Sequence, residues 1–539
     1  MKKPFAITLD VGSSLANRTG SWRTERPVYL DRLPPCNATC AAGENIQEWL
    51  FHAEEAAYES AWRVLMRDNP LPAIMGRVCY HPCESACNRG RLDESVGINS
   101  VERFLGDQAL KEGWTIEPAE ATGKRVIVVG SGPAGLSAAY HLRRMGHAVT
   151  IFEAEPQAGG MMRYGIPQYR LPRDVLDAEI ARILAMGVEL RVNQQVSDLA
   201  ATMKSEGFDA CFLGVGAQIG RRAYIPAGDA NRITDAVSVL HGIAGDDKPL
   251  LGRRVVVYGG GNTAVDVART ARRLGAEESI IVYRRTPEKM PAHAGEVQEA
   301  IEEGVKLKWL TTIKEAGNET ITIEKMELDD DGFPQPTGEL EVMPADSVVL
   351  ALGQDVDTGL LDALDLQVER GSVKVGADMM TGEAGVFAGG DMVDGDRTVT
   401  VAVGHGKKAA RAIDAWLRGQ EYTAPAKHEL ATYERLNTWY YSDAGKTVRP
   451  MLDVIRRQST FDEVRGGLDE SNALYEARRC LSCGNCFECD TCYGVCPDNA
   501  VIKLGPGKRF EFNYDYCKGC GLCVAECPCG AIKMEPEAV

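Results

Sequence analysis

Two stretches of the chain repeat the same order of hydrophobic and helical positions. Residues 125–129 (Arg-Val-Ile-Val-Val) and 254–258 (Arg-Val-Val-Val-Tyr) are short apolar runs, and each is followed by a glycine-rich turn and a helical pattern. A further apolar run follows each helix, at 148–152 and 279–283. Short apolar strands that alternate with helices are typical of parallel sheets covered on both faces. The pattern therefore predicts an α/β fold with two units of similar design.

The turn after the first strand fits the pattern G-x-G-x-x-G, which binds dinucleotides in Rossmann-type folds. Gly130 allows the tight turn, Gly132 lets a pyrophosphate approach the backbone, and Gly135 lets helix and strand pack. Glu153 ends the second strand and is placed to accept hydrogen bonds from ribose hydroxyls, while the helix N-terminus faces the phosphates. The candidate cofactor-binding residues here are Gly130, Gly132, Pro133, Ala134, Gly135 and Glu153.

The second glycine-rich turn, residues 259–264, fits G-x-G-x-x-A. The strand after its helix ends in Arg284-Arg285, where the first copy has Glu153. Arginine at this place accommodates a 2′-phosphate, which favours NADPH over NADH. A solvated basic pair at a strand end is the alternative interpretation. The candidate residues are Gly259, Gly261, Asn262, Thr263, Ala264, Arg284 and Arg285.

A third glycine-containing stretch lies further along the chain. Gly389-Gly390-Asp391 closes a short strand, and a helix begins near Thr400. This order could place the Asp391 carboxylate on a ribityl hydroxyl and the helix dipole near an isoalloxazine ring. Residues 346–353 also form an apolar run that closes on glycine, which predicts that the chain returns to the first unit at residue 346.

The cysteines near the end of the chain follow a repeated spacing. Residues 486–496 have the order C-x2-C-x2-C-x3-C-P, and residues 517–527 repeat it. This is the spacing of a bacterial-type ferredoxin with two 4Fe–4S clusters, in which the fourth thiolate of each run serves the other cluster. A zinc ribbon, which would use two C-x2-C pairs, and a disulfide knot are the alternatives. The predicted ligand sets are Cys486, Cys489, Cys492 and Cys527 for one cluster, and Cys517, Cys520, Cys523 and Cys496 for the other.

Five further cysteines lie within residues 1–122, in two loops that flank a helical pattern. They are Cys36, Cys40, Cys79, Cys83 and Cys87. An iron–sulfur cage and a set of buried free thiols are the two interpretations of this group.

Composition narrows the class of protein. The chain has 539 residues, enough for several domains, and its 17 cysteines indicate metal or redox chemistry in a reducing compartment. The net charge of −17 leaves no basic surplus to neutralise phosphates, so nucleic acid is not expected as a partner. The first residues hold no long apolar run, so no export signal is expected, and no run approaches the ~18 residues of a membrane span. A cytoplasmic redox protein is therefore expected.

Several motifs together resemble a known family. They are Gly76-Arg77-Val78-Cys79, the glycine pattern at 130–135, the stretch 159–167, the stretch 260–266 and Gly389-Gly390-Asp391. Residues from about 20 to 420 resemble the small (beta) subunit of NADPH-dependent glutamate synthase and related FAD/NAD(P)H oxidoreductases. The resemblance implies a disulfide-reductase-like arrangement with FAD at the first unit, where Gly160 and Met161 contribute, and NAD(P)H at the second. It also implies a helical N-terminal iron–sulfur domain.

The N-terminal cysteines depart from the family pattern. Members carry a C-x2-C pair before Cys36, whereas this chain has Val28 and Asp31 there. The resemblance therefore implies that one of two N-terminal clusters is missing and that Cys36 and Cys87 have lost their partners. The other 4Fe–4S cluster would keep Cys40, Cys79, Cys83 and, as a fourth ligand, Glu102. A rearranged quartet that uses Cys36 or Cys87 is the alternative.

Two more features bear on the resemblance. NADPH-type members often carry another arginine shortly after the basic pair, where this chain has 291–295 (Pro-Ala-His-Ala-Gly), so NADH stays open. The C-terminal segment resembles the ferredoxin-type delta subunits of 2-oxoacid:ferredoxin oxidoreductases. Cys480 and Cys483 are surplus to that pattern and are either ligands of another metal or orphan thiols. Cys529 is expected to be structural.

The expected domains follow from these motifs. They are a helical iron–sulfur domain (1–122), a first FAD-binding part (123–245), an NAD(P)H-binding domain (246–345), a second FAD-binding part (346–420), a linker (421–479) and a small α+β ferredoxin domain (480–539). Within the linker, the aromatic run Trp439-Tyr440-Tyr441 is expected to lie in a core, and a docking surface is the alternative.

The expected function is electron transfer between NAD(P)H and a redox partner through FAD and 4Fe–4S clusters. The flavin supplies the hydride chemistry, so no catalytic side chain is expected. The resemblance implies a hetero-oligomer whose partner is a 2-oxoacid oxidoreductase or a ferredoxin. The alternatives are a glutamate synthase small subunit that serves a glutamate-forming large subunit, and a non-catalytic electron-storage protein.

Overall fold

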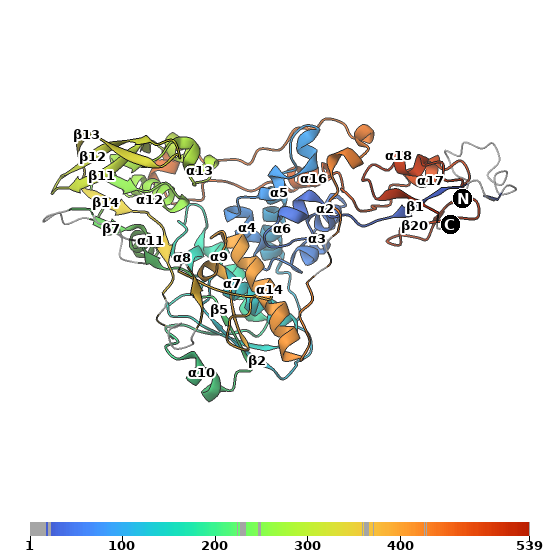
Figure 1. The fold of residues 1–539 in the computed structure, drawn as a ribbon, viewed down its shortest axis with the longest axis horizontal. Helices are drawn as coiled ribbons and strands as arrows, with labels where there is room; N and C mark the ends of the chain where they lie inside the picture. Colours follow the sequence, from blue (N-terminus) through green and yellow to red (C-terminus); the bar gives the residue numbers. More distant parts are fainter. Residues whose placement is uncertain are drawn as a thin grey trace.

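The computed structural model describes residues 18–19, 23–221, 223, 225–226, 233–245, 249–357, 359, 366–369, 371–424, 426 and 428–537. The expected lack of an export signal concerns residues 1–17, which lie outside these ranges. Over the described ranges, no helix combines the length and the apolar character needed to cross a membrane. Figure 1 shows an elongated molecule in which the N-terminal helices lie between two α/β units and the cysteine-rich C-terminal region.

The first α/β unit is built on a parallel sheet with the strand order β18-β5-β2-β3-β4. Its strands are β2 (Arg125–Val129), β3 (Ala148–Phe152), β4 (Glu189–Arg191), β5 (Ala210–Leu213) and β18 (Val386–Ala388). The helices of this unit are α7 (Pro133–Arg144), α8 (Met161–Tyr164), α9 (Arg173–Ala185), α10 (Leu199–Glu206) and α14 (Val399–Leu417). β2 is buried because β3 and β5 pair with it on either side, and α14 packs along α7.

The second α/β unit is built on a parallel sheet with the strand order β10-β9-β8-β14-β7. Its strands are β7 (Ile233–Asp235), β8 (Arg254–Tyr258), β9 (Glu278–Val282), β10 (Lys306–Lys308) and β14 (Ser347–Leu350). Its helices are α11 (Ala236–Ala244), α12 (Asn262–Arg273) and α13 (Ala294–Glu302). An antiparallel sheet of β11 (Thr311–Ala316), β12 (Thr320–Leu328) and β13 (Pro334–Pro344) adjoins it.

β14 lies in the second sheet, which differs from the expected return to the first unit at residue 346. It pairs in parallel with β8 on one side and β7 on the other. The second unit therefore begins before residue 246 and ends after residue 345, the bounds expected from the sequence. The chain crosses between the units where β6 (Ile219–Gly220) pairs with β15 (Gln354–Asp355). A short apolar strand that ends in glycine fits either parallel sheet, so its pattern does not distinguish them.

Most of the N-terminal helices contribute to one buried apolar cluster, whereas α4 (Pro72–Val78) packs into the core of the first α/β unit. The other helices are α1 (Pro35–Thr39), α2 (Ile46–Glu54), α3 (Tyr58–Leu65), α5 (Pro82–Ser85) and α6 (Ile98–Glu112). Trp49 lies in this cluster and Trp62 lies in the core of the first α/β unit, and both are fully buried. The cysteines lie on either side of α2 and α3 as expected, but Cys36 lies within α1 and Cys83 within α5 rather than in loops.

The C-terminal region contains α17 (Thr491–Val495), β19 (Val501–Lys503), β20 (Phe510–Phe512), α18 (Leu522–Ala525) and β21 (Ile532–Pro536). β21 pairs with β1 (Glu25–Tyr29) in antiparallel fashion, and Val28 lies opposite Lys533. The Tyr29 ring stacks on Phe512 at a centroid distance of 4.7 Å. A strand expected to belong to the N-terminal domain therefore completes the C-terminal one.

Residues 428–479, called here the connecting segment, begin beside the C-terminal region, cross to the second α/β unit and return to the N-terminal helices (Figure 1). They form α15 (Val454–Ser459), which packs on α12, and α16 (Glu470–Arg478), which packs on α2 and α6. The expectation of a core position for the aromatic run is wrong, because Trp439 is 87% exposed and Tyr440 is 48% exposed. This run forms a turn on the surface of the C-terminal region, where the Tyr440 hydroxyl donates to Glu526.

Candidate functional site

A cavity of about 590 Å³ lies between the two α/β units. Its wall contains the first glycine-rich turn, from Gly130 to Ala134, together with Gly160 and Met161. Asn262 and Thr263 of the second glycine-rich turn line the same cavity. Both dinucleotide patterns therefore open into one space, which would bring the reactive ends of two bound cofactors together.

The first turn is held by hydrogen bonds to the end of β3. The Gly130 amide donates to the Phe152 carbonyl at 2.8 Å. The Glu153 carboxylate is buried, lines the cavity, and accepts from both the amide and the hydroxyl of Ser131. Gly135 lies inside α7 against the turn. A rigid carboxylate is thus available to a ribose at the position that the sequence predicts, and Ser131, which the sequence pattern did not single out, orients it.

Asp391 and the start of α14 form another part of the cavity wall. Burial raises the pKa of the Asp391 carboxyl. Thr398 caps α14, and both Thr398 and Val399 line the cavity, so the positive end of the helix dipole faces it. Thr400 is not among the described lining residues, and its hydroxyl instead lies 3.6 Å from the Met75 sulfur. The helical periodicity turns Thr400 away from the space that its neighbours face.

The second turn joins β8 to α12 in the same way. The Gly259 amide donates to the Val282 carbonyl at 3.1 Å, and Gly261 immediately precedes α12. Asn262 accepts a hydrogen bond from the His293 amide at 2.8 Å, and Ala264 is buried in the helix. These contacts place the turn as the pattern predicts.

The basic pair after β9 is divided between two environments. Arg284 is exposed. Arg285 is half-buried, with its guanidinium 5.9 Å from the centre of the Phe333 ring on the antiparallel sheet. Arg284 is thus the more accessible of the two to a phosphate.

Three parts of the chain meet at an ion-pair network on the cavity wall. Arg170 from the first unit pairs with Asp266 of α12 at 2.7 Å and with Glu296 of α13. Burial raises the pKa of Glu296 to about 7, although Arg170 lowers it. Tyr80 of the N-terminal region lines the cavity beside Arg170. The network depends on tertiary contacts, and no short-range sequence signal identifies it.

Cys79 lies directly behind the cavity wall, because its neighbours Val78 and Tyr80 both line the cavity. Burial and then the charge of Glu102 raise the pKa of Cys79 to about 12. Burial, followed by Cys79 and Cys40, raises the pKa of Cys83. The structure therefore brings together the four side chains expected to hold the N-terminal cluster: Cys40, Cys79, Cys83 and Glu102.

A second carboxylate, that of Glu44, lies beside these four side chains. The Asn69 side-chain amide donates to Glu44 and to Glu102, each at 2.9 Å. Burial raises the pKa of Glu44 to about 7, and burial followed by Glu44 raises that of Glu102 well above its usual range. Glu44 was not predicted from the sequence. The one available signal was its position four residues after Cys40.

The C-terminal cysteines lie close to one another. Burial, with Cys486, Cys489 and Cys527 adding to it, raises the pKa of Cys492 to about 12. Burial also raises the pKa of Cys523, with Cys492 of the other predicted set as the first neighbour, followed by Cys517, Cys496 and Cys520. The last cysteine of each run therefore lies near the other run, and the two predicted ligand sets adjoin at Cys492 and Cys523. Cys489 and Cys520 are exposed, which places one thiol of each set at the surface.

Three protein-family models match the chain. Residues 124–406 match the model described as pyridine nucleotide-disulphide oxidoreductase. Residues 25–114 match dihydropyrimidine dehydrogenase domain II, 4Fe–4S cluster, and residues 485–531 match a 4Fe–4S dicluster domain. Cys480 and Cys483 lie outside both iron–sulfur matches.

Curated relatives match over most of the chain. The NADP(+)-dependent formate dehydrogenase subunit beta of Moorella thermoacetica is 36% identical, covering 83% of this chain and 70% of that protein. The small chain of NADPH glutamate synthase from Escherichia coli is 33% identical, covering 71% and 89%. The NAD-dependent dihydropyrimidine dehydrogenase subunit PreT of Escherichia coli is 34% identical, covering 71% and 91%. Of these three relatives, the formate dehydrogenase subunit matches the largest share of this chain.

Proposed function

We propose that this chain, which belongs to the family of pyridine nucleotide-disulphide oxidoreductases, carries electrons between NADPH and an iron–sulfur redox partner. The chain is an NAD(P)H-dependent flavin oxidoreductase with 4Fe–4S domains. NADPH would lose a hydride, which is two electrons and one proton, and the electrons would leave one at a time. Bound FAD supplies this change from hydride to single electrons, so the chain's own residues position and shield the cofactors.

The observation that carries the proposal is the shared cavity. Its wall holds Gly130–Ala134 and Asp391 for the flavin and Asn262 and Thr263 for the nicotinamide coenzyme. Val78 and Tyr80, on either side of Cys79, line the same space. A cluster held by Cys79 would therefore lie next to the flavin, where it can take single electrons as they leave.

The C-terminal ferredoxin region is proposed as the outlet to the partner, because Cys489 and Cys520 bring a thiol of each set to the surface. Relatives named as subunits of a formate dehydrogenase and of glutamate synthase support a place in a hetero-oligomer. The proposed partner is a ferredoxin or a 2-oxoacid oxidoreductase, in the cytoplasm. The match to the glutamate synthase small chain covers 71% of this chain, and residues 485–531 match a 4Fe–4S dicluster domain that offers an outlet of its own, which favours this partner over a glutamate-forming subunit.

Anaerobic addition of NADPH to the holoprotein is expected to bleach the flavin absorbance and then reduce added ferredoxin. The shared cavity allows the first step and the exposed C-terminal thiols the second. The two steps are followed by absorbance in a stopped-flow instrument. Bleaching without ferredoxin reduction would leave the enzyme class intact and remove ferredoxin as the partner. If neither NADPH nor NADH bleaches the flavin, the proposed function is wrong.

Arg284→Ala is expected to weaken NADPH binding and leave NADH binding unchanged. Arg284 is exposed at the end of β9, where a 2′-phosphate is recognised in such folds. A hydrogen bond to a charged group contributes about 1.5–3 kcal/mol, or about 10- to 150-fold in affinity. Arg285→Ala is the matched control and should have the smaller effect, because that guanidinium lies against Phe333. Titrations with both coenzymes measure the difference, and equal losses for NADPH and NADH would contradict the assignment.

A further inference from the structure

Four cysteines that the proposed function leaves unused converge where the connecting segment meets the N-terminal helices. Cys36 lies in α1 and Cys87 follows α5, whereas Cys480 and Cys483 follow α16. Cys36, Cys87 and Cys480 pack against one apolar cluster. The side-chain amide of Asn88, next to Cys87, lies 3.4 Å from the Cys483 sulfur. The Cys36 thiol is buried and interacts with the charges of Cys480, Cys87 and Cys483, in agreement with these contacts.

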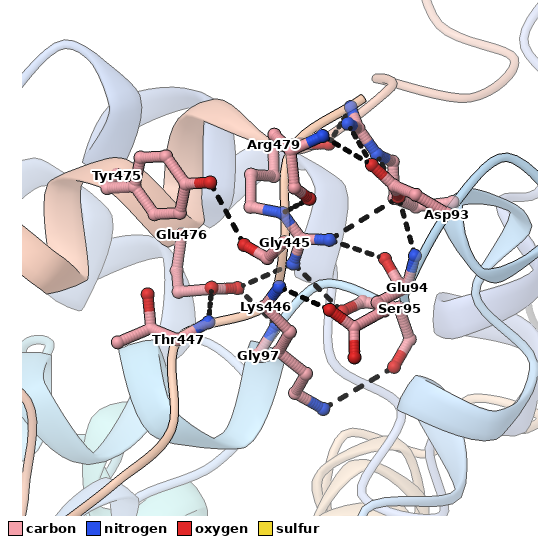
Figure 2. Close-up of polar contacts among 12 residues, drawn as sticks. Asp93, Glu94, Ser95, Gly97, Gly445, Lys446, Thr447, Tyr475, Glu476 and Arg479 are labelled. Atoms are coloured by element: carbon pink, nitrogen blue, oxygen red, sulfur yellow. Dashed lines mark hydrogen bonds and ion pairs between the residues drawn. The ribbon is translucent and has the colours of Figure 1, made fainter. Parts of the chain in front are cut away.

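The end of α16 is fixed against the loop that follows Cys87 (Figure 2). The Arg479 guanidinium donates to the Ser95 carbonyl at 3.0 Å and to the Glu94 carbonyl at 2.6 Å. The Glu476 carboxylate accepts from the Gly97 amide at 2.7 Å. Arg479 and Glu476 are 2% and 0% exposed and pair with each other at 3.0 Å. Cys480, the next residue, is therefore held in place beside the N-terminal cysteines.

The loop that carries Cys480 and Cys483 lies beside the place where the family pattern lacks its thiols. The Arg32 amide donates to the Gly484 carbonyl at 3.1 Å, and the Asn485 side chain donates to the Arg32 carbonyl at 3.2 Å. Arg32 directly follows Asp31, one of the two positions at which the resemblance implies a cysteine. A C-x2-C pair from the end of the chain thus stands next to the position of the missing N-terminal pair.

Hydrogen-bond donors are directed at these sulfurs. The Ser482 amide lies 3.4 Å from the Cys480 sulfur. The Asn88 side-chain amide is directed at the Cys483 sulfur at 3.4 Å. Backbone amides of Val96, Arg89 and Gly90 are directed at the Cys87 sulfur. Donors of this kind stabilise thiolates and tune iron–sulfur potentials, which buried free thiols would not require.

We propose that Cys36, Cys87, Cys480 and Cys483 bind an additional 4Fe–4S cluster, assembled from both ends of the chain. Four cysteine thiolates are the usual ligand set of such a cluster. Within the described ranges, no three His, Cys, Asp or Glu side chains are placed to hold a single metal ion. The thiolates of a cube each bind a different iron and stand farther apart than the four ligands of one zinc ion, so a cube agrees with this finding.

The site lies between the other two groups of cysteines. Cys36 and Cys40 lie in adjacent turns around α1, which joins the site to the cluster behind the flavin cavity. On its other side, the Tyr441 hydroxyl donates to the Leu481 carbonyl at 3.3 Å, and burial, then Cys480 and Cys529, raise the pKa of Tyr441. The cluster would therefore relay single electrons from the flavin side to the ferredoxin region. This relay rests on the proposed function, whereas the metal site itself does not.

The double variant Cys480→Ala/Cys483→Ala is expected to lose about four iron and about four sulfide per chain relative to the wild-type holoprotein. NADPH should still bleach its flavin, because the variant leaves the cavity intact, while the ferredoxin clusters should no longer be reduced at the wild-type rate. Ser482→Ala, in the same loop but without loss of a thiol, is the matched control and should keep the full iron content. Anaerobic iron and sulfide analysis, with spin quantitation of the reduced protein, measures these contents.

Cys36→Ala/Cys87→Ala should lose the same four iron atoms, and removal of all four cysteines should lose no more. Because a variant can fail to fold, the wild-type holoprotein gives an independent result: about sixteen iron per chain supports the site, and about twelve overturns it. Unchanged iron in a folded double variant, or zinc in place of iron, would also overturn it. Sixteen iron together with a flavin that NADPH does not bleach would reject the proposed function and retain the site.

Discussion

Replacing Gly132 by alanine is expected to remove most of the bound flavin while the apoprotein stays folded. Gly132 precedes α7 with φ −67° and ψ −179°, which alanine adopts readily, and a Cβ built there meets no atom within 4 Å. The methyl group would instead stand in the cavity, where the pyrophosphate of FAD is proposed to approach the backbone. Such a clash costs about 1–3 kcal/mol, or about 5- to 150-fold in binding. The flavin content of the purified protein and an FAD titration measure the loss.

Two other glycines provide the controls. Gly261 holds the equivalent place before α12, and a Cβ there also meets nothing within 4 Å, so Gly261→Ala should weaken NADPH binding and keep the flavin. At Gly135 a Cβ would lie 1.9 Å from the Gly130 carbonyl oxygen, so Gly135→Ala should lose both flavin and stability. A Gly132→Ala protein with normal FAD affinity would show that the first turn does not hold the flavin.

The elements that the sequence predicted depend on short-range patterns. A strand, a glycine turn and a helix lie within about twenty residues of one another, and the C-x2-C spacing fixes three thiols locally. The fold class follows from these patterns, and both glycine turns lie where they predict. The crossed partners Cys527 and Cys496 were also predictable, because the repeated spacing implies them.

The features that the sequence did not predict depend on contacts between distant parts of the chain. The C-x2-C pair at Cys480 and Cys483 could not be assigned to a site from the sequence, because only the docking of α16 brings it beside Cys87. β14 resembles a strand of either sheet, and only its pairing with β8 places it. Glu44 joins Glu102 through Asn69, which lies between them in the sequence and carries no motif. Hydrophobicity alone suggested a core position for Trp439, but a single exposed aromatic is common on protein surfaces.

Glu303→Gln is expected to lower the free energy of unfolding by about 3–5 kcal/mol, the usual cost of breaking a buried ion pair by removing one partner. Glu303 is fully buried between Arg269 and Arg273 of α12, with contacts of 2.6–3.1 Å. It also accepts from Arg457 of α15 at 3.2 Å. The neutral amide would remove the carboxylate that pairs with Arg273, and it would weaken the contacts of Arg269 and Arg457, which keep Glu299 and Glu302 as partners. Because α15 belongs to the connecting segment, the change should also loosen the segment that delivers Cys480 and Cys483. Anaerobic urea unfolding of the holoprotein, followed by far-ultraviolet circular dichroism, measures the loss.

Glu302→Gln is the matched control, since Glu302 pairs with the same Arg457 at 3.0 Å but its side chain is 42% exposed. An exposed pair contributes about 0.2–1 kcal/mol, so the loss in free energy of unfolding should be several-fold smaller for Glu302→Gln than for Glu303→Gln.

Acid should remove the difference in stability between wild type and Glu303→Gln. Burial alone would raise the pKa of Glu303, but the hydrogen bonds from Arg269 and Arg273 outweigh it and lower the value from 4.5 to about 2. A depressed pKa contributes stability that is fully present above the unfolded value of 4.5 and is lost as the pH falls towards 2. The gap between wild type and Glu303→Gln should therefore stay constant from neutral pH down to about 5 and narrow below 4.5. A gap that is small at neutral pH, or that widens in acid, would show that the three arginines do not depend on this carboxylate.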